Sequence, residues 1–339
     1  MKKTLSTITL ILLLAIAILF NYRPRPEQLA RYLVEGKPAK TENNELTVQF
    51  LGNTNLLFSD GNTAILTDGF FSRPSVLKVL FGKVEPDRTA IINCLNRAGF
   101  SKLDAVIPLH SHFDHAMDAP AVAQITRAKL MGSSSTANIG RGYGLAERQI
   151  EIPQLDSTYS IGDFKVTFIK SQHWQYPDAE QRLVLLNNAI EKPLITPASI
   201  YDYKEGDSYT LLIEHGSIKI AVQGSAGYKP GSLNHFDADI LFLAIAGLEM
   251  MDEQYNDGYQ QHLIEPLQPE VLIPIHWDDF TVPLGDELKT TNLLVKLKMD
   301  TNLEGAFQQI EKRNLSQGRA IKVLPLWQRV GIKQLIDNK

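Results

Sequence analysis

The chain has 339 residues, of which 44% are hydrophobic, so it is long enough to bury one large core or two modest ones. A formal net charge of -4 at pH 7 leaves no basic surplus to neutralise phosphates, which argues against a nucleic-acid partner. The single cysteine, Cys94, excludes an internal disulfide framework and says little about the cellular compartment.

The first 26 residues have the composition of a targeting segment. Lys2 and Lys3 precede an apolar run over residues 8–20, and arginine and proline alternate over residues 23–26. The run with its flanks nearly reaches the length of about 20 residues that a spanning helix needs. Because no small-x-small cleavage pattern follows it, we predict a signal-anchor, with a cleaved signal peptide as the alternative. Both predict an exported protein, either membrane-anchored and facing the periplasm or cell exterior, or secreted.

The next segment, residues 27–45, is polar and lacks a persistent periodicity, so we predict a linker or an arm along the surface. A single globular domain is predicted over residues 46–339. It opens with strand patterns at residues 46–51, 54–58 and 63–67, and Ser-Asp-Gly-Asn at 59–62 has the turn chemistry of a hairpin between the last two. Asp68 ends the third strand, where it is compatible with an ordinary turn residue. Residues 86–98 have an amphipathic helical pattern that Gly99 ends, with Cys94 as a packing residue.

The strongest chemical signal is the sequence H-S-H-F-D-H over His110–His115. A mostly apolar run over residues 103–109 precedes it and indicates a buried strand, which delivers a polar loop at its carboxyl end, where open α/β sheets usually carry their chemistry. Asp118 and Pro120 then introduce a helical run over 121–128. Imidazole and carboxylate together suit zinc, and ligand type does not exclude iron or manganese. With only eight histidines in the chain, three of them beside one aspartate favour metal binding over a chance cluster.

A serine- and glycine-rich stretch over residues 132–144 follows a short strand pattern at 129–131. We predict a mobile loop at the mouth of the site, from which Arg141 or Tyr143 could touch the substrate. It lacks the frame of a phosphate-binding loop.

A strand pattern over residues 164–170 leads into His173 and Trp174. His173 is compatible with a metal ligand or with a surface-turn histidine, and Trp174 is a candidate substrate contact. Residues 175–206 contain several prolines and aromatics without clean periodicity and are long for a plain connection. This predicts a cover over the site, with a passive insertion as the alternative.

The last third repeats the pattern of a buried strand that ends in a histidine. Residues 209–214 and 218–223 form a predicted hairpin, residues 239–246 are continuously apolar, and residues 271–275 are a final core strand that delivers His276. A helix is predicted over 252–267, another around 303–312, and a closing strand around 320–326.

The H-x-H-x-D-H motif after a strand resembles the signature of the metallo-β-lactamase superfamily, an α/β fold built as a four-layer αβ/βα sandwich of metal-dependent hydrolases. The resemblance runs from about Leu46 onward and is greatest to the branch of lactonase-like and N-acylphosphatidylethanolamine phospholipase D-like enzymes. It implies that Asp68 lies beneath the metal loop and orients it. It also implies two metal-binding groups, which are His110, His112 and His173 for the first ion and Asp114, His115 and His276 for the second.

One stretch departs from the family pattern. Residues 223–228 align with a segment in which a Gly-Asp-Thr-Gly supplies an aspartate that bridges two metals, and Ser225 stands at the aspartate position. A hydroxyl is a weak ligand beside a carboxylate. Some metallo-β-lactamases with serine at this place hold a second zinc without it, so one or two ions remain open.

The resemblance implies a metal-dependent hydrolase in which a zinc-activated hydroxide attacks an ester, lactone or phosphodiester, and in which Asp114 orients the nucleophile. The export signal favours a small-molecule or lipid-like substrate close to a membrane. The alternative from another class is a non-catalytic metal-binding or sensor domain in which Ser225 marks decay of the site. A β-lactamase is less favoured, because no feature of the sequence indicates a β-lactam pocket.

Overall fold

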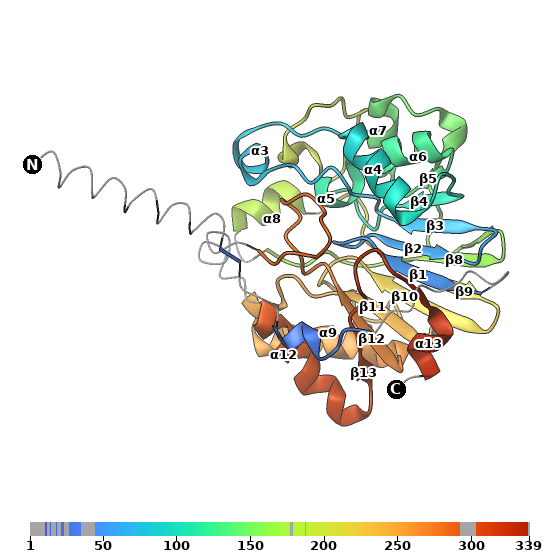
Figure 1. The fold of residues 1–339 in the computed structure, drawn as a ribbon, viewed down its shortest axis with the longest axis vertical. Helices are drawn as coiled ribbons and strands as arrows, with labels where there is room; N and C mark the ends of the chain where they lie inside the picture. Colours follow the sequence, from blue (N-terminus) through green and yellow to red (C-terminus); the bar gives the residue numbers. More distant parts are fainter. Residues whose placement is uncertain are drawn as a thin grey trace, which may run out of the picture.

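The computed structural model describes residues 11, 14, 18, 22–23, 27–34, 45–176, 179–186, 188–291 and 303–337. In this part of the chain the strands form two seven-stranded sheets that pack face to face. Helices α4, α6 and α7 lie outside one sheet, and α9, α12 and α13 lie outside the other (Figure 1). The arrangement is a mixed α/β fold with two sheets, as predicted.

The first sheet has the strand order β14-β1-β2-β3-β4-β5-β6. Its first three sequential strands are antiparallel, and β3 to β6 are parallel, because each of these later connections runs through a helix or turn on the outer face. The strands are β1 (Thr47–Phe50), β2 (Leu56–Ser59), β3 (Ala64–Thr67), β4 (Ala105–Ile107), β5 (Lys129–Met131), β6 (Ile150–Glu151) and β14 (Arg329–Gly331).

The second sheet has the order β13-β12-β11-β10-β9-β8-β7. Strands β7 to β10 are antiparallel, and β10 to β13 are parallel. The strands are β7 (Thr158–Ile161), β8 (Phe164–Lys170), β9 (Tyr209–His215), β10 (Ile218–Gln223), β11 (Ile240–Ala244), β12 (Val271–Ile275) and β13 (Ala320–Ile321). All residues of β11 and β12 are buried, as their unbroken apolar sequences predict.

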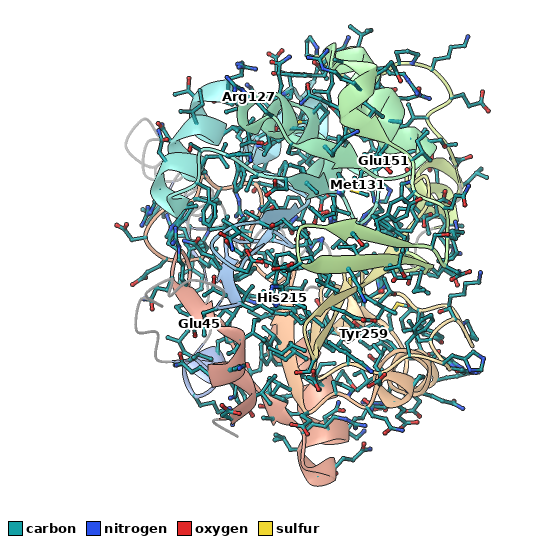
Figure 2. The ribbon with its side chains drawn as sticks, turned by 90° about the vertical axis from the view of Figure 1, so that its right-hand side faces the viewer. Glu45, Arg127, Met131, Glu151, His215 and Tyr259 are labelled. Atoms are coloured by element: carbon teal, nitrogen blue, oxygen red, sulfur yellow. The ribbon has the colours of Figure 1, made fainter. Side chains whose placement is uncertain are left out.

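Aromatic side chains fill the space between the sheets. Phe58 of β2 and Phe242 of β11 meet edge to face with ring centroids 5.5 Å apart. In the side view, Met131 and Glu151 of the first sheet lie above Tyr259, which belongs to the helical layer of the second (Figure 2). These aromatic contacts pack the two sheets against each other.

The helices follow their sequence signals at most places. Helix α4 begins where the Asp87 carboxylate accepts the backbone N–H groups of Thr89 and Ala90, and it ends at Gly99 with φ 81°. The α-helices are α2 (Glu27–Ala30), α3 (Val76–Phe81), α4 (Arg88–Ala98), α5 (Phe113–Ala116), α6 (Ala119–Thr126), α7 (Ser134–Tyr143), α8 (Ala179–Leu185), α9 (Glu253–Tyr259), α10 (Glu265–Leu267), α12 (Leu303–Asn314) and α13 (Ile332–Asp337). Short 3₁₀ turns lie at Glu147–Gln149, Ile200–Asp202, Leu248–Met250 and Leu315–Gln317, and a π-helical turn lies at Gln260–Ile264.

The prediction of a mobile loop over residues 132–144 is wrong, because most of this stretch is helix α7. The Ser133 hydroxyl accepts the backbone N–H of Thr136 at the beginning, and Gly144 ends the helix with φ 85°. Gly142 lies against backbone, since a Cβ there would stand 1.9 Å from the Leu194 carbonyl oxygen. Gly140 and Gly142 therefore allow close packing of the helix.

Residues 27–34 lie along the surface of the domain. Leu29 is buried with the main core, Tyr32 stacks on Phe307 with ring centroids 6.4 Å apart, and the Val34 N–H donates to the Val323 carbonyl at 2.9 Å. The signal-anchor predicted over residues 1–26 falls almost entirely outside the described residues. Within the part that is described, no helix combines the length and apolar character needed to cross a membrane.

Candidate metal centre

The metal-loop histidines follow β4, which is buried between β3 and β5 in the first sheet. The Leu109 N–H donates to the Asp68 carboxylate at 2.8 Å, and the Ser111 N–H donates to the Glu205 carbonyl at 2.9 Å. The Ser111 hydroxyl also lies 2.9 Å from the hydroxyls of Ser133 and Thr136 at the start of α7. Contacts on both sides thus fix the backbone that carries the histidines.

His110, His112 and His173 form the first group. The loops after β4 and β8 bring them together, and their candidate ligand atoms lie within 4.8 Å of one another. His110 Nε2 lies 3.1 Å from His112 Nδ1, and the His173 ring lies 4.7 Å and 4.6 Å from the rings of His110 and His112. All three side chains are buried.

Asp114, His115 and His276 form the second group, from the metal loop and the end of β12. The two Nε2 atoms of His115 and His276 are 3.2 Å apart. The Asp114 carboxylate oxygen lies 3.5 Å from His115 Nε2 and 3.4 Å from His276 Nε2. The rings of His110 and His115 have centroids 3.8 Å apart, so the two groups adjoin.

The nitrogen spacing in both groups fits a shared cation. Two nitrogens that each lie about 2.0–2.1 Å from a tetrahedral zinc are roughly 3.3 Å from each other. The observed separations of 3.1 Å and 3.2 Å are close to that value. Three protein ligands in each group leave further coordination positions for water or substrate, which is the pattern of catalytic and not structural zinc sites.

Hydrogen bonds behind the rings select which nitrogen faces the centre. His115 Nδ1 lies 2.8 Å from the Asp68 carboxylate, and His173 Nδ1 lies 2.7 Å from the Trp174 carbonyl oxygen. Because a carboxylate and a carbonyl only accept, each Nδ1 carries the proton and each Nε2 presents a lone pair to its group. Asp68 thus lies where the sequence prediction placed it, beneath the metal loop.

The family model of the β-lactamase superfamily domain matches residues 47–276, more than half of the chain. The chain belongs to this family. The resemblance to the metallo-β-lactamase superfamily that the motif predicted is therefore confirmed, and the matched range spans all six residues of the two groups.

Two relatives in the superfamily are named UPF0173 metal-dependent hydrolases. The chain is 24% identical to the one from Myxococcus xanthus over 264 residues, which cover 77% of this chain and 81% of that protein. It is 25% identical to the one from Polynucleobacter asymbioticus over 193 residues, covering 56% and 62%. Among solved structures, Igni18, a metallo hydrolase from Ignicoccus hospitalis, superposes with a TM-score of 0.49 at 14% identity, covering 84% of this chain and 97% of that one.

Burial and charge set the protonation of this β-lactamase superfamily site. Burial and the neighbouring imidazoles hold the pKa values of His110 and His173 well below the usual value, so both rings are neutral. Burial disfavours charge on His115 as well, but Asp68 and Asp114 outweigh it and raise the pKa. Burial alone would raise the pKa of Asp114, yet His115 and His276 outweigh it and hold the pKa well below its usual value. The carboxylates therefore favour a cation at the second group.

Asn53 joins the two loops that carry the second group, and the sequence analysis missed it. Its side-chain amide donates to the Asp114 carbonyl at 2.7 Å, and its own carbonyl accepts the His276 N–H at 2.9 Å. Its N–H donates to Asp278 at 2.6 Å, and Asp278 is paired with the buried guanidinium of Arg73 at 2.6 Å. The available signal was the polar run Gly-Asn-Thr-Asn between two buried strands, where polar side chains need partners.

Ser225 lies at the turn after β10 and is buried. Its hydroxyl accepts the backbone N–H of Trp174 at 2.9 Å, directly after His173. The Trp174 ring is also buried and donates its Nε1–H to the Gly247 carbonyl at 3.2 Å. Ser225 and Trp174 therefore hold the His173 loop in place.

Arg141 and Tyr143 were predicted as substrate contacts on a mobile loop, but they lie near the end of α7 and have other partners. Arg141 donates to Glu147 at 2.7 Å and to Asn138 at 3.0 Å. The Tyr143 hydroxyl accepts from Arg88 of α4 at 2.7 Å. Because α7 is a helix, it directs these side chains to neighbouring helices and turns.

The predicted cover, residues 175–206, begins with a second residue that the sequence analysis missed. The Tyr176 ring stacks on His173 with centroids 5.5 Å apart and planes 23° apart, and burial together with Asp114 raises the pKa of its hydroxyl. The segment then packs on α7, where Ile190 N–H donates to Ser135 and Leu194 N–H donates to Asn138. It ends at Glu205, which contacts the metal loop. The segment is thus packed beside the metal loop at both ends.

A third group, Asp60, Asp163 and His215, lies away from these loops at the turns of three hairpins. The Asp60 carboxylate accepts the backbone N–H groups of Asn62 and Thr63 and contacts His215 Nε2 at 3.0 Å. His215, labelled in Figure 2, thus ties β9 of one sheet to the β2–β3 turn of the other. The contact between His215 and Asp60 therefore joins the two sheets.

Proposed function

We propose that the chain is a metal-dependent hydrolase that acts on an ester, lactone or phosphodiester. One observation carries the proposal, namely two adjoining groups of three ligand residues whose nitrogens have the spacing of a shared cation. The names of the two relatives support hydrolysis. The superfamily fold by itself would not, because one fold hosts many activities.

The donor set favours zinc, and we propose one ion in each group. When bound, zinc lowers the pKa of a coordinated water to about 7 and polarises a substrate oxygen. His110, His112 and His173 would hold the first ion, and Asp114, His115 and His276 the second. Since the Ser225 hydroxyl is engaged by Trp174, the second group relies on its own three residues.

The residues of this chain supply position and charge. Asp114 is ionised at neutral pH and lies beside the Nε2 atoms of His115 and His276, where its carboxylate can accept a hydrogen bond from the attacking water and orient it. Asp68 fixes the ring of His115, and Asn53 fixes the backbone of Asp114 and His276. Tyr176 and the cover limit the access of water at His173.

The substrate in this proposal is a small molecule, and a lipid-like one in particular. Its support is the apolar run over residues 8–20, which would place the enzyme at a membrane facing the periplasm or cell exterior, or deliver it as a secreted protein. A non-catalytic sensor of the same fold is the competing function, and Ser225 is the residue that favours it.

The deciding test compares Asp114→Ala with wild type after zinc loading. We expect turnover of generic esters, lactones or bis-p-nitrophenyl phosphate to fall by a factor of about 10³ or more, because the variant loses a ligand and the water-orienting carboxylate. Metal analysis should still find the first ion. Asp337→Ala, at an exposed aspartate of α13 outside all three groups, is the matched control and should keep full activity. Undiminished turnover in Asp114→Ala would contradict the role, and zinc-loaded wild type that is inert towards every substrate class would favour the sensor.

A further inference from the structure

Helix α3 is apolar but buries none of its residues. Its sequence is V-L-K-V-L-F, and the structure leaves Leu77, Leu80 and Phe81 exposed, with Phe81 at 83%. A helix that is apolar around its circumference is ordinarily buried in a core or in lipid. Exposed apolar side chains that gather in one region mark an interaction surface.

The cover segment adds exposed apolar side chains beside α3. Val84, just after α3, exchanges backbone hydrogen bonds of 2.8 Å and 3.0 Å with Ala198, and Val79 and Ile200 pack against the same buried cluster. Helices α3 and α8 lie on the same side of the molecule (Figure 1). We call the exposed side chains of both segments the apolar rim, which consists of Leu77, Leu80, Phe81, Leu183, Ile195 and Tyr201.

An ion pair places Arg23, which follows the N-terminal apolar run in the sequence, near this rim. The guanidinium of Arg23 lies 3.2 Å from the buried carboxylate of Asp279, three residues after His276. The next residue, Phe280, has its ring 6.2 Å from the His276 ring and packs against the cluster that also holds Val79 of α3. The loop over residues 276–280 thus contacts Arg23 and the buried cluster beneath the rim, and it carries the metal-centre residue His276.

We propose that the apolar rim rests on a lipid bilayer which the N-terminal apolar run also enters, so that the metal centre faces the membrane and takes acyl-chain substrates from it. The described residues of that run, Ile11, Leu14 and Ile18, are exposed, as lipid-facing side chains would be. Lys78 lies among the exposed positions of α3 and Lys83 follows the helix, and both can contact phosphate headgroups. The acyl-chain substrate in this proposal rests on the proposed hydrolase function. The membrane contact does not, because it can be measured without turnover.

The first experiment measures contact between the apolar rim and lipid directly. Cys94 is the only cysteine and is buried, so Cys94→Ala gives a background for a single environment-sensitive label at Phe81→Cys. In the full chain reconstituted with phosphatidylcholine vesicles, we expect blue-shifted emission that brominated acyl chains quench. Leu315→Cys is the matched control, since Leu315 is exposed but lies at the end of α12, and its label should stay unquenched. Equal quenching at the two positions, or a shift at position 81 that depends on protein concentration and not on lipid, overturns the proposal.

The second experiment measures whether the enzyme takes its substrate from the membrane. Because burial of a leucine or phenylalanine side chain contributes about tenfold or more to an equilibrium constant, Leu80→Glu with Phe81→Glu should lower turnover of a vesicle-embedded long-chain ester at least about tenfold. Turnover of a soluble short-chain ester should stay unchanged. An equal loss on both substrates, or no loss on the embedded one, contradicts the proposal. Absence of any hydrolysis by wild type defeats the proposed function, whereas the label at position 81 still tests the membrane contact.

Discussion

Asp68 is a single carboxylate with three separate partners. It lies fully buried at a left-handed φ of 55°, where it accepts from the Leu109 N–H, the Thr54 hydroxyl and the ring of His115. These bonds join the β1–β2 connection, the end of β3 and the metal loop. A residue of this kind fixes the tautomer and the angle of a ligand without contacting the ion.

Replacing Asp68 by alanine should therefore weaken the second ion before the first. We expect zinc affinity at the second group to fall about 10–100-fold, with a similar loss in turnover, because His115 loses the acceptor that orients it. Isothermal titration with zinc resolves the two sites. The exposed Asp337→Ala again serves as the control. Two unchanged affinities would show that the hydrogen bond has no positioning role.

Asp118 gives a prediction on pH. It is fully buried at the start of α6, and burial raises its pKa to about 6, although bonds from Ser72 and Phe71 act in the opposite direction. Because the folded pKa exceeds the unfolded value of about 3.9, the folded state binds the proton more tightly. Its contribution to stability is thus fully present below about pH 4 and is lost as pH rises to about 6.

Asp118→Asn removes this titration. The advantage of wild type over the variant in free energy of unfolding should fall between pH 4 and pH 6, by up to roughly 3 kcal/mol, and stay constant above that range. Urea unfolding at a series of pH values measures it. A difference between the two proteins that does not change with pH would contradict the raised pKa of Asp118.

At the scale of elements, the strands that deliver ligands were predictable and helix α7 was not. Strands β4 and β12 are short apolar runs that lead into a histidine, and a short unbroken apolar run is typical of a buried strand. Helix α7 has two glycines and three hydroxyl residues, which are weak helix formers. Its stability comes from end capping and from the cover segment, a contact that joins residues about fifty positions apart.

Gly142→Ala tests that contact between elements. Alanine is the better helix former, so local propensity alone predicts stabilisation. The structure predicts the opposite, a loss of about 1–3 kcal/mol, because the added Cβ would overlap the Leu194 backbone. Gly285→Ala, where a Cβ meets nothing within 4 Å, should change stability little. Thermal unfolding of both variants decides the matter, and a stabilised Gly142→Ala would show that α7 and the cover are not in tight contact.

At the scale of the molecule, each candidate metal group draws on both sheets. The first takes His110 and His112 from the first sheet and His173 from the second, and the second group takes His276 from the second sheet. The sequence could predict which residues follow strands, and the six predicted ligands do lie in two groups of three. It could not predict Asn53 or Tyr176, because their importance comes from contacts between loops that only the assembled sheets bring together.

Removal of metal should therefore loosen the contact between sheets while leaving each sheet folded. A ligand that binds only the folded state at 100 times its dissociation constant adds about 2.7 kcal/mol of stability. We expect chelation to lower the melting temperature by several degrees and to speed amide hydrogen exchange in the loops after β4, β8 and β12, more than in β11. If chelation left the exchange rates of all these segments unchanged, the ions would not link the sheets.

The positions of the tryptophans have a practical consequence. Trp174 and Trp277 each follow a candidate ligand histidine directly, and both indoles are buried, whereas Trp327 lies in a separate part of the chain. Intrinsic fluorescence should thus report ion loading without any dye. Since neighbouring Cu²⁺ or Co²⁺ quenches indole emission, the two centres could be followed one at a time in Trp174→Phe and Trp277→Phe proteins, and the order of filling would become an optical measurement.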